Sequence, residues 1–266
     1  MVFRHLFPLQ SSRFVLFLVT LGATLAAALV LSPAARAETL TLRSDYWCPY
    51  NCTPGGEPPG YMIEIARKVF EPAGYRIDYQ LMPYDEAIEA ARKGEITAVV
   101  GAARKDAPDL AFTTSSQGTT TYAFASAKGS GFAYTGPESL KGIRLGAIQD
   151  YTYDAAIDAH IAAGDGVTLV SGDTATRDLV QLLADGKVDV IIEGDAVLDY
   201  TIAEMGMVNL FDLFVASQGA PVYIAFSPAH PKVAELVTLL DKGIADLRAS
   251  GDLTKIMRRY GKKDWQ

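Results

Sequence analysis

The sequence predicts an α/β protein made of two lobes of similar size. Between residues 38 and 266, short apolar or alternating stretches typical of β-strands alternate with amphipathic stretches typical of helices. This alternation stops at Gly129-Ser130-Gly131 and then starts again. The two series indicate two mainly parallel sheets, each flanked by helices, and the glycine-rich break between them marks a boundary.

The first series contains three predicted strands and two predicted helices. The strand patterns cover residues 40–43, 76–81 and 96–100, and the helix patterns cover residues 61–69 and 84–93. In the first helix, Met62, Ile65 and Val69 fall on one stripe, as expected of a helix with one face in a core. Gly94 ends the second helix, and the last strand is apolar except for Thr97, as expected in a buried parallel sheet.

The second series repeats this pattern and then adds a helical C-terminus. The strand patterns cover residues 144–148, 167–171, 188–192 and 221–226, and the helix patterns cover residues 152–162, 173–183, 196–205, 232–249 and 253–260. Asp173 or Thr174 is expected to cap the second of these helices, because short polar side chains accept hydrogen bonds from the free amides of a first turn.

The first 37 residues have the pattern of a secretory signal peptide. Arg4 and Arg13 precede an apolar run at residues 14–31, and Ala35-Arg36-Ala37 follows as a small-x-small cleavage site. We therefore expect export to the periplasm, with cleavage after Ala37. The alternative is an uncleaved membrane anchor, because the 18 residues of the apolar run are just long enough to span a bilayer.

The composition narrows the classes of partner. Without its leader the chain carries 21 basic and 31 acidic side chains, a formal charge of −10, so it offers no electrostatic basis for binding nucleic acid or anionic lipid. No later segment is apolar for long enough to span a membrane. His5, His160 and His230 are far apart in sequence, so we expect no metal site, and no motif indicates a cofactor or a nucleotide.

The two cysteines, Cys48 and Cys52, lie close together in the segment Trp47-Cys48-Pro49-Tyr50-Asn51-Cys52. In an exported, oxidising compartment this pair is expected to form a structural disulfide that fixes the turn carrying Trp47 and Tyr50. Two other interpretations stay open. A redox dithiol lacks the two-residue spacing of thioredoxin-like sites, and a metal site lacks further cysteines or clustered histidines.

Five sequence motifs carry a resemblance to a known family. In chain order they are Pro59-Gly60-Tyr61-Met62-Ile63-Glu64-Ile65-Ala66, Gly94-Glu95-Ile96-Thr97-Ala98-Val99, Lys141-Gly142-Ile143-Arg144-Leu145-Gly146-Ala147-Ile148-Gln149, Gly186-Lys187-Val188-Asp189-Val190-Ile191 and Asp246-Leu247-Arg248-Ala249-Ser250-Gly251-Asp252-Leu253. Through them, residues 38–266 resemble the exported solute-binding proteins of polar-amino-acid ABC transporters. These form bacterial extracellular solute-binding protein family 3 and have the two-lobed fold of type II periplasmic binding proteins.

The resemblance implies where the lobes divide and where a ligand binds. Lobe one would comprise residues 38–127 and 222–266, and lobe two residues 128–221, with a hinge between them. A small ligand would bind in the cleft between the lobes and be enclosed when the hinge closes.

The resemblance also assigns ligand-binding residues in lobe one. Trp47 and Tyr84 match the aromatic side chains that stack on the ligand, where large rings bury its body and attract a cation on it. The alternative is that each ring is simply a side chain of the hydrophobic core. Arg104 matches the arginine that binds an amino-acid carboxylate, and its alternative is an exposed turn residue.

In lobe two, the resemblance points to one hydroxyl and one carboxylate. Thr152 lies in the turn that matches a second carboxylate site, just before a helix, although it could serve only as the N-cap of that helix. The acid that binds the ligand's ammonium group would be Glu193, in preference to its near neighbour Asp195. A strand-end acid could instead be solvated.

The resemblance implies a non-catalytic binding protein, expected to be a monomer in the periplasm. It would capture a small polar solute, such as an amino acid or amine, and deliver it to the membrane permease of an ABC transporter. Two other functions stay open. An enzyme on the same scaffold, such as a cyclohexadienyl or arogenate dehydratase, would use a cleft acid such as Glu193 as a general acid or base. A solute sensor or accessory subunit would bind the ligand and report to another protein.

Overall fold

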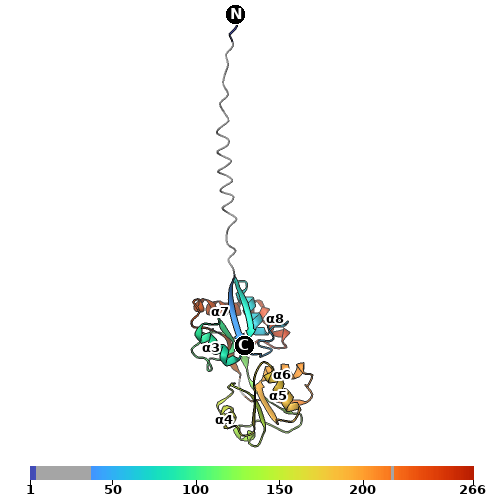
Figure 1. Cartoon of the computed structure of the whole chain (residues 1–266). Coiled ribbons are helices and arrows are strands. Elements are labelled where there is room, and N and C mark those ends of the chain that lie inside the picture. The colour runs from blue at the N-terminus through green and yellow to red at the C-terminus, as the bar shows by residue number, and fades with distance from the viewer. Residues whose placement is uncertain (4–36, 217–218) are drawn as a thin grey trace. The chain divides into compact units, whose positions relative to one another are not determined.

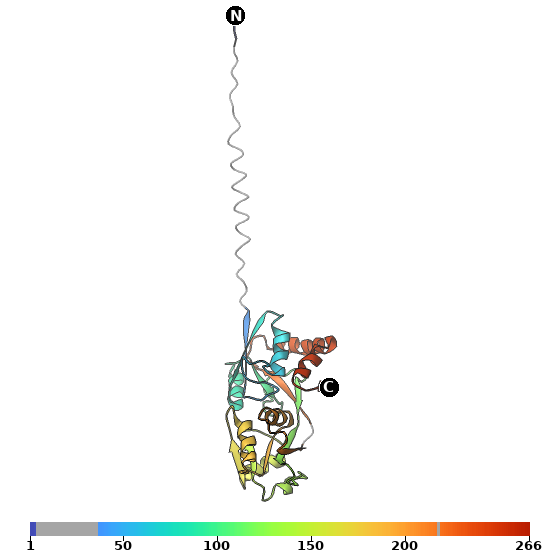
Figure 2. The ribbon, with the colours of Figure 1, turned by 90° about the vertical axis from the view of Figure 1, so that its right-hand side faces the viewer.

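A computed structural model describes residues 1–3, 37–216 and 219–266. The chain divides into an N-terminal segment, Met1–Ala37, and a compact unit, Glu38–Gln266, which Figures 1 and 2 show from two directions. Of the expected signal peptide, residues 4–36, which include the apolar run at residues 14–31, lie outside the described residues. Within the described ranges, no helix combines the length and the hydropathy needed to cross a membrane.

The first of two five-stranded sheets combines strands from the first part of the compact unit with one strand from its C-terminal part. Its strand order is β2-β1-β3-β10-β4. These strands are β1 (Glu38–Ser44), β2 (Tyr75–Leu81), β3 (Ala98–Ala102), β4 (Gly118–Thr120) and β10 (Ala220–Phe226). β1 pairs in parallel with β2 and β3, whereas β10 runs antiparallel between β3 and β4. Because β10 follows the second sheet in the chain, the C-terminal segment returns to lobe one.

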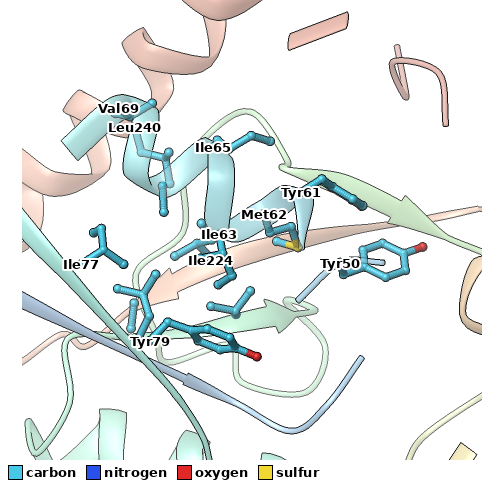
Figure 3. Close-up of a cluster of buried hydrophobic side chains, with 14 of the residues drawn as sticks. Tyr50, Tyr61, Met62, Ile63, Ile65, Val69, Ile77, Tyr79, Ile224 and Leu240 are labelled. Atoms are coloured by element: carbon cyan, nitrogen blue, oxygen red, sulfur yellow. The ribbon is translucent and has the colours of Figure 1, made fainter. Parts of the chain in front are cut away.

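Four helices pack around the first sheet (Figure 1). They are α2 (Tyr61–Phe70), α3 (Tyr84–Lys93), α7 (Val233–Ser250) and α8 (Asp252–Arg259). α2 contacts β2, α7 and α8, and α7 also contacts β10. Figure 3 shows the core beside α2, where Met62, Ile65 and Val69 meet Leu240 of α7 and Ile77 of β2. The stripe predicted from the sequence is therefore the buried face of α2.

The second sheet has the strand order β7-β6-β8-β5-β9. Its strands are β5 (Tyr122–Ala127), β6 (Leu145–Ile148), β7 (Val167–Val170), β8 (Val190–Gly194) and β9 (Phe211–Val215), and its helical segments are η1 (Pro137–Leu140), α4 (Ala155–Ala163), α5 (Ala175–Ala184) and α6 (Asp195–Glu204). β6 pairs in parallel with β7 and β8, and β5 runs antiparallel between β8 and β9. α5 and α6 pack on each other and on β8. This two-lobed α/β arrangement confirms the predicted fold class. Each sheet, however, has two parallel and two antiparallel pairings, so the sheets are mixed and not mainly parallel as expected.

The sheets divide the chain at a different point from the one expected. β5 pairs with β8 and β9, so residues 122–127 belong to the second sheet, and the first crossing between the lobes lies just before Tyr122 instead of after residue 127. The second crossing precedes Ala220, where β10 begins, two residues before the expected position. β5 was hard to predict because its sequence, Tyr-Ala-Phe-Ala-Ser-Ala, has no β-branched residue.

The helix expected at residues 152–162 also begins later. α4 starts at Ala155, because the side chain of Asp154 accepts hydrogen bonds from two backbone amides of the first turn at 2.9 and 3.0 Å. Asp154 is therefore the N-cap, and the alternative role of Thr152 as a cap is wrong.

Candidate functional site

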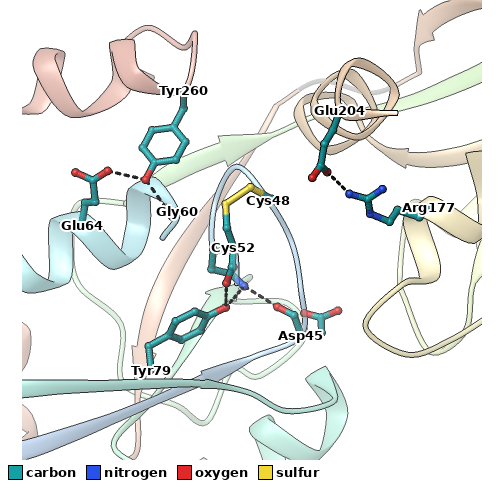
Figure 4. Close-up of a disulfide and its surroundings, with 10 residues drawn as sticks. Asp45, Cys48, Cys52, Gly60, Glu64, Tyr79, Arg177, Glu204 and Tyr260 are labelled. Carbon is teal, nitrogen blue, oxygen red and sulfur yellow. Dashed lines mark hydrogen bonds and ion pairs between the residues drawn. A yellow bond between two sulfur atoms is a disulfide. The ribbon is translucent and has the colours of Figure 1, made fainter. Parts of the chain in front are cut away.

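A turn closed by the disulfide between Cys48 and Cys52 follows β1 (Figure 4), and Trp47 directly precedes Cys48 in the chain. Cys48 and Cys52 are bonded and buried, which confirms the predicted disulfide. Within the turn, the Trp47 amide donates to the carbonyl oxygen of Asn51 at 3.0 Å. The hydroxyl of Tyr79, in β2, donates to the Cys52 carbonyl oxygen at 2.9 Å. The turn is thereby fixed to the first sheet.

The ring of Trp47 lies where the two sheets approach each other. It is 8% exposed and stacks on Tyr50 with ring centroids 4.0 Å apart. A Cβ atom added at Gly101 of β3 would lie 3.2 Å from the Trp47 ring, and one added at Gly194 of β8 would lie 3.6 Å from it. The indole therefore contacts both lobes, and a side chain at Gly101 would crowd it. Trp47 is thus a buried core side chain and an interlobe side chain at once.

Glu193, in β8, is fully buried and faces Trp47. Its Oε1 accepts hydrogen bonds from Trp47 Nε1 at 3.1 Å and from the Gly194 amide at 2.6 Å. Its Oε2 is buried and has no hydrogen-bond partner among the described residues. Burial raises the pKa of Glu193 to about 7, with a further increase from the charge of Asp45, although the two hydrogen bonds lower it. Glu193 is therefore not a solvated acid at the end of a strand, which was the alternative expectation.

Asp45 directly follows β1 and contacts the other lobe. Its carboxylate accepts hydrogen bonds from the Tyr151 hydroxyl and, at 3.2 Å, from Ser44 Oγ. Burial raises the pKa of Asp45 to about 6 despite these hydrogen bonds. Lobe one thus contributes the carboxyl group of Asp45, and lobe two contributes that of Glu193. Each carboxyl group accepts a hydrogen bond from a donor in the opposite lobe.

Four tyrosine rings continue from Asp45 into lobe two. Tyr84 of lobe one meets Tyr151 edge to face, with centroids 6.4 Å apart. Tyr153 lies 6.4 Å from Tyr151 and 5.1 Å from Tyr122 by the same measure. Burial raises the pKa of all four phenols, so their hydroxyls are neutral at physiological pH. The predicted ligand residue Tyr84 thus belongs to a mixed aromatic and carboxylate cluster at the lobe interface.

Two polar contacts join the lobes beside these rings. Thr152 Oγ donates to Asp106 Oδ1 at 2.9 Å, and Lys105 Nζ donates to the Tyr153 carbonyl oxygen at 3.0 Å. The Thr152 carbonyl oxygen accepts from the Tyr122 hydroxyl at 2.8 Å. The structure therefore places Thr152 at the lobe interface, in contact with an acid of lobe one.

Arg104 is held by groups of lobe one. Its Cζ lies 4.8 Å from the ring centroid of Phe112 and 4.8 Å from that of Tyr223. Its Nη2 donates to the Thr113 carbonyl oxygen at 2.6 Å. All these contacts are within lobe one, and none of them is to Trp47, Tyr84, Thr152 or Glu193.

Asp45, Tyr151 and Tyr153 are part of this cluster, and sequence reasoning did not single them out as ligand-binding residues. One signal was present for Asp45, which immediately follows the first strand. Ligands of open α/β sheets bind beyond the carboxyl ends of the strands. Across the described ranges, no group of three or more histidine, cysteine or acidic side chains is placed to hold a metal ion.

Solved structures with the same fold include proteins with different described roles. An ancestral arginine-binding protein bound to arginine has a TM-score of 0.69 and 20% identity, covering 85% of this chain and 99% of that chain. A histidine kinase sensor domain with similarity to periplasmic binding proteins has a TM-score of 0.69 and 22% identity, covering 85% and 96%. The ancestral amino acid-binding protein AncCDT-1, described as a precursor of cyclohexadienyl dehydratase, has a TM-score of 0.64 and 16% identity, covering 84% and 95%. At these identities the likeness shows the fold alone.

The sequence itself identifies the family. No curated protein matches the chain. Residues 41–263 match the family described as bacterial extracellular solute-binding proteins, family 3, and this range includes both sheets and nearly all of the compact unit. On this match and the two-lobed fold, the chain belongs to family 3 of the bacterial extracellular solute-binding proteins.

Proposed function

We propose that this protein is the periplasmic solute-binding component of an ABC uptake system. It is exported by its leader, is cleaved after Ala37, and captures a small polar solute with an ammonium group between its lobes for delivery to a membrane permease. It acts as a monomer and does not transform the solute. The observation that carries the proposal is Glu193, a fully buried carboxyl group with one unpartnered oxygen, in contact with Trp47 of the opposite lobe.

An ammonium group fits this arrangement for electrostatic reasons. A buried carboxyl group is costly to ionise without a cation, which is why the pKa of Glu193 is raised to about 7. An ammonium supplies N–H donors for Oε2 and the charge that the carboxylate lacks. The Trp47 face also attracts a cation. Because Trp47 and Glu193 come from different lobes, a solute that contacts both stabilises the lobes against each other.

The test is a binding screen on the mature protein, residues 38–266, with amino acids and small amines. We expect at least one ammonium solute to raise the melting temperature, since a ligand that binds only the folded state stabilises it. We expect Glu193→Gln to weaken the binding of that solute by about 10-fold or more, the usual scale for a hydrogen bond to a charged group. Asp165→Asn, which removes an exposed acid elsewhere in lobe two, is the matched control. The proposal is wrong if no solute binds, or if Glu193→Gln binds as tightly as the wild type.

A second candidate function is catalysis on the same scaffold. It is favoured by the pKa of Glu193, because a value of about 7 suits a general acid or base at neutral pH. Incubation with prephenate and arogenate distinguishes the two functions. Turnover that disappears in Glu193→Gln would establish catalysis, and binding without turnover would establish transport or sensing.

A further inference from the structure

The lobe interface holds two carboxyl groups that no cation of the described chain neutralises. The charged side chains that act on them are acids: Asp173 raises the pKa of Asp45, and Asp45 raises that of Glu193. Their hydrogen-bond donors are all uncharged, namely the Ser44 and Tyr151 hydroxyls, the Trp47 indole and the Gly194 amide. Negative charge is therefore concentrated between the lobes.

Two basic side chains beside this interface bind groups other than Asp45 and Glu193. Arg104 lies between the rings of Phe112 and Tyr223 and donates to a carbonyl oxygen of lobe one. Lys105 donates to the Tyr153 carbonyl oxygen. Neither side chain is paired with Asp45 or Glu193.

The groups that would bind a solute carboxylate in lobe two already contact acids of this chain. Asp154 caps the N-terminus of α4 and accepts from two of its free amides. The Tyr153 amide donates to Asp158 at 2.8 Å, and the Thr152 hydroxyl donates to Asp106 at 2.9 Å. A solute carboxylate here would face carboxylates in place of free donors, and like charges repel.

We propose that the solute is an organic dication without a carboxylate, of the linear diamine class. One ammonium group binds at Asp45 and the other at Glu193, with the methylene chain against the rings of Trp47, Tyr84 and Tyr151. Aromatic faces suit both parts of such a molecule, because they bury methylene groups and attract cations. This inference rests on the proposed function and specifies the solute for the same site.

The test compares three ligands that differ in one group each: 1,5-diaminopentane, lysine and 1-aminopentane. Calorimetry is done at pH 8, where both carboxyl groups are ionised, and shorter and longer linear diamines are included to find the best chain length. We expect the best diamine to bind at least about 10-fold more tightly than lysine and 1-aminopentane, because only it matches both carboxylates. Lysine binding as tightly as the diamine would overturn the inference and leave solute binding intact. The inference also fails if no diamine binds at about 1 mM. The proposed function is also wrong only if, in addition, no amino acid binds.

Variants test the placement of the two charges. Asp45→Asn is expected to weaken diamine binding by about 10-fold or more and to change 1-aminopentane binding by less than about threefold, since the single ammonium stays at Glu193. Glu193→Gln is expected to weaken the binding of both ligands, and Asp165→Asn to change neither. An equal loss for diamine and monoamine in Asp45→Asn would assign Asp45 a structural role and overturn the inference.

Discussion

The raised pKa values of Asp45 and Glu193 predict that the protein without solute is more stable at pH 5.5 than at pH 8. A carboxyl group whose pKa is raised by folding holds its proton more tightly in the folded state. Its stabilising effect is fully present below the unfolded pKa and is lost as the pH rises through the folded pKa. The window for Glu193 runs from its ordinary value of 4.5 to about 7, and that for Asp45 from 3.8 to about 6.

The magnitude follows from these pKa values. Between pH 5.5 and 8, Glu193 should lower the free energy of unfolding by about 2 kcal/mol and Asp45 by roughly 0.8 kcal/mol. Urea unfolding at both pH values measures the loss. In Glu193→Gln, which cannot ionise, we expect the loss between the two pH values to be smaller by about 2 kcal/mol. Asp165→Asn should keep the wild-type loss.

One outcome would refute this reasoning. If wild type and Glu193→Gln lose the same free energy between pH 5.5 and 8, Glu193 titrates in the folded protein with its ordinary pKa. The carboxyl group would then be solvated, and neither its burial nor its contact with Trp47 would hold in solution.

Three further variants separate the roles of individual side chains. Trp47→Phe keeps a ring on Tyr50 but removes the donor to Glu193, so calorimetry should show ammonium-solute binding weakened by about 10-fold at pH 7. Arg104→Ala should lower the free energy of unfolding by about 1 kcal/mol through lost cation–π contacts and leave solute affinity within about twofold; a larger loss of affinity would place Arg104 on the ligand. Replacing Cys48 and Cys52 together by Ser should cost about 2 kcal/mol in urea unfolding, as the loop-entropy relation gives for so short a loop.

Much of the fold could be predicted because local signals and tertiary packing agree. The expected limits of α3, Tyr84 and Lys93, match the structure, since Pro83 precedes the helix and Gly94 ends it in the left-handed conformation with φ of 77°. The missed strand β5 shows the limit of such signals. It is a strand because β8 and β9 pair with it on either side, and this pairing with distant segments cannot be seen in its own residues.

The site was less predictable than the fold, for the same reason. Trp47 and Glu193 were found through the family motif, but their hydrogen bond joins residues 146 positions apart. Asp45 was missed because what makes it part of the site is the contact with Tyr151, 106 residues later. A strand-end acid has the same local sequence whether it is solvated or buried against the other lobe.

Because of where the two carboxyl groups lie, hydrogen bonds between the lobes are linked to the ionisation of Asp45 and Glu193. Trp47 of lobe one donates to Glu193 of lobe two, and Tyr151 of lobe two donates to Asp45 of lobe one. Both of these hydrogen bonds therefore depend on a carboxyl acceptor. With the lobes in contact, Glu193 is fully buried and close enough to feel the charge of Asp45, which favours a proton on Glu193 at neutral pH. When a cationic solute is bound, Glu193 no longer holds this proton, because the charge of the solute stabilises the ionised carboxylates. In the proposed function, solute binding between the lobes therefore releases protons, and affinity rises with pH while the stability of the protein without solute falls.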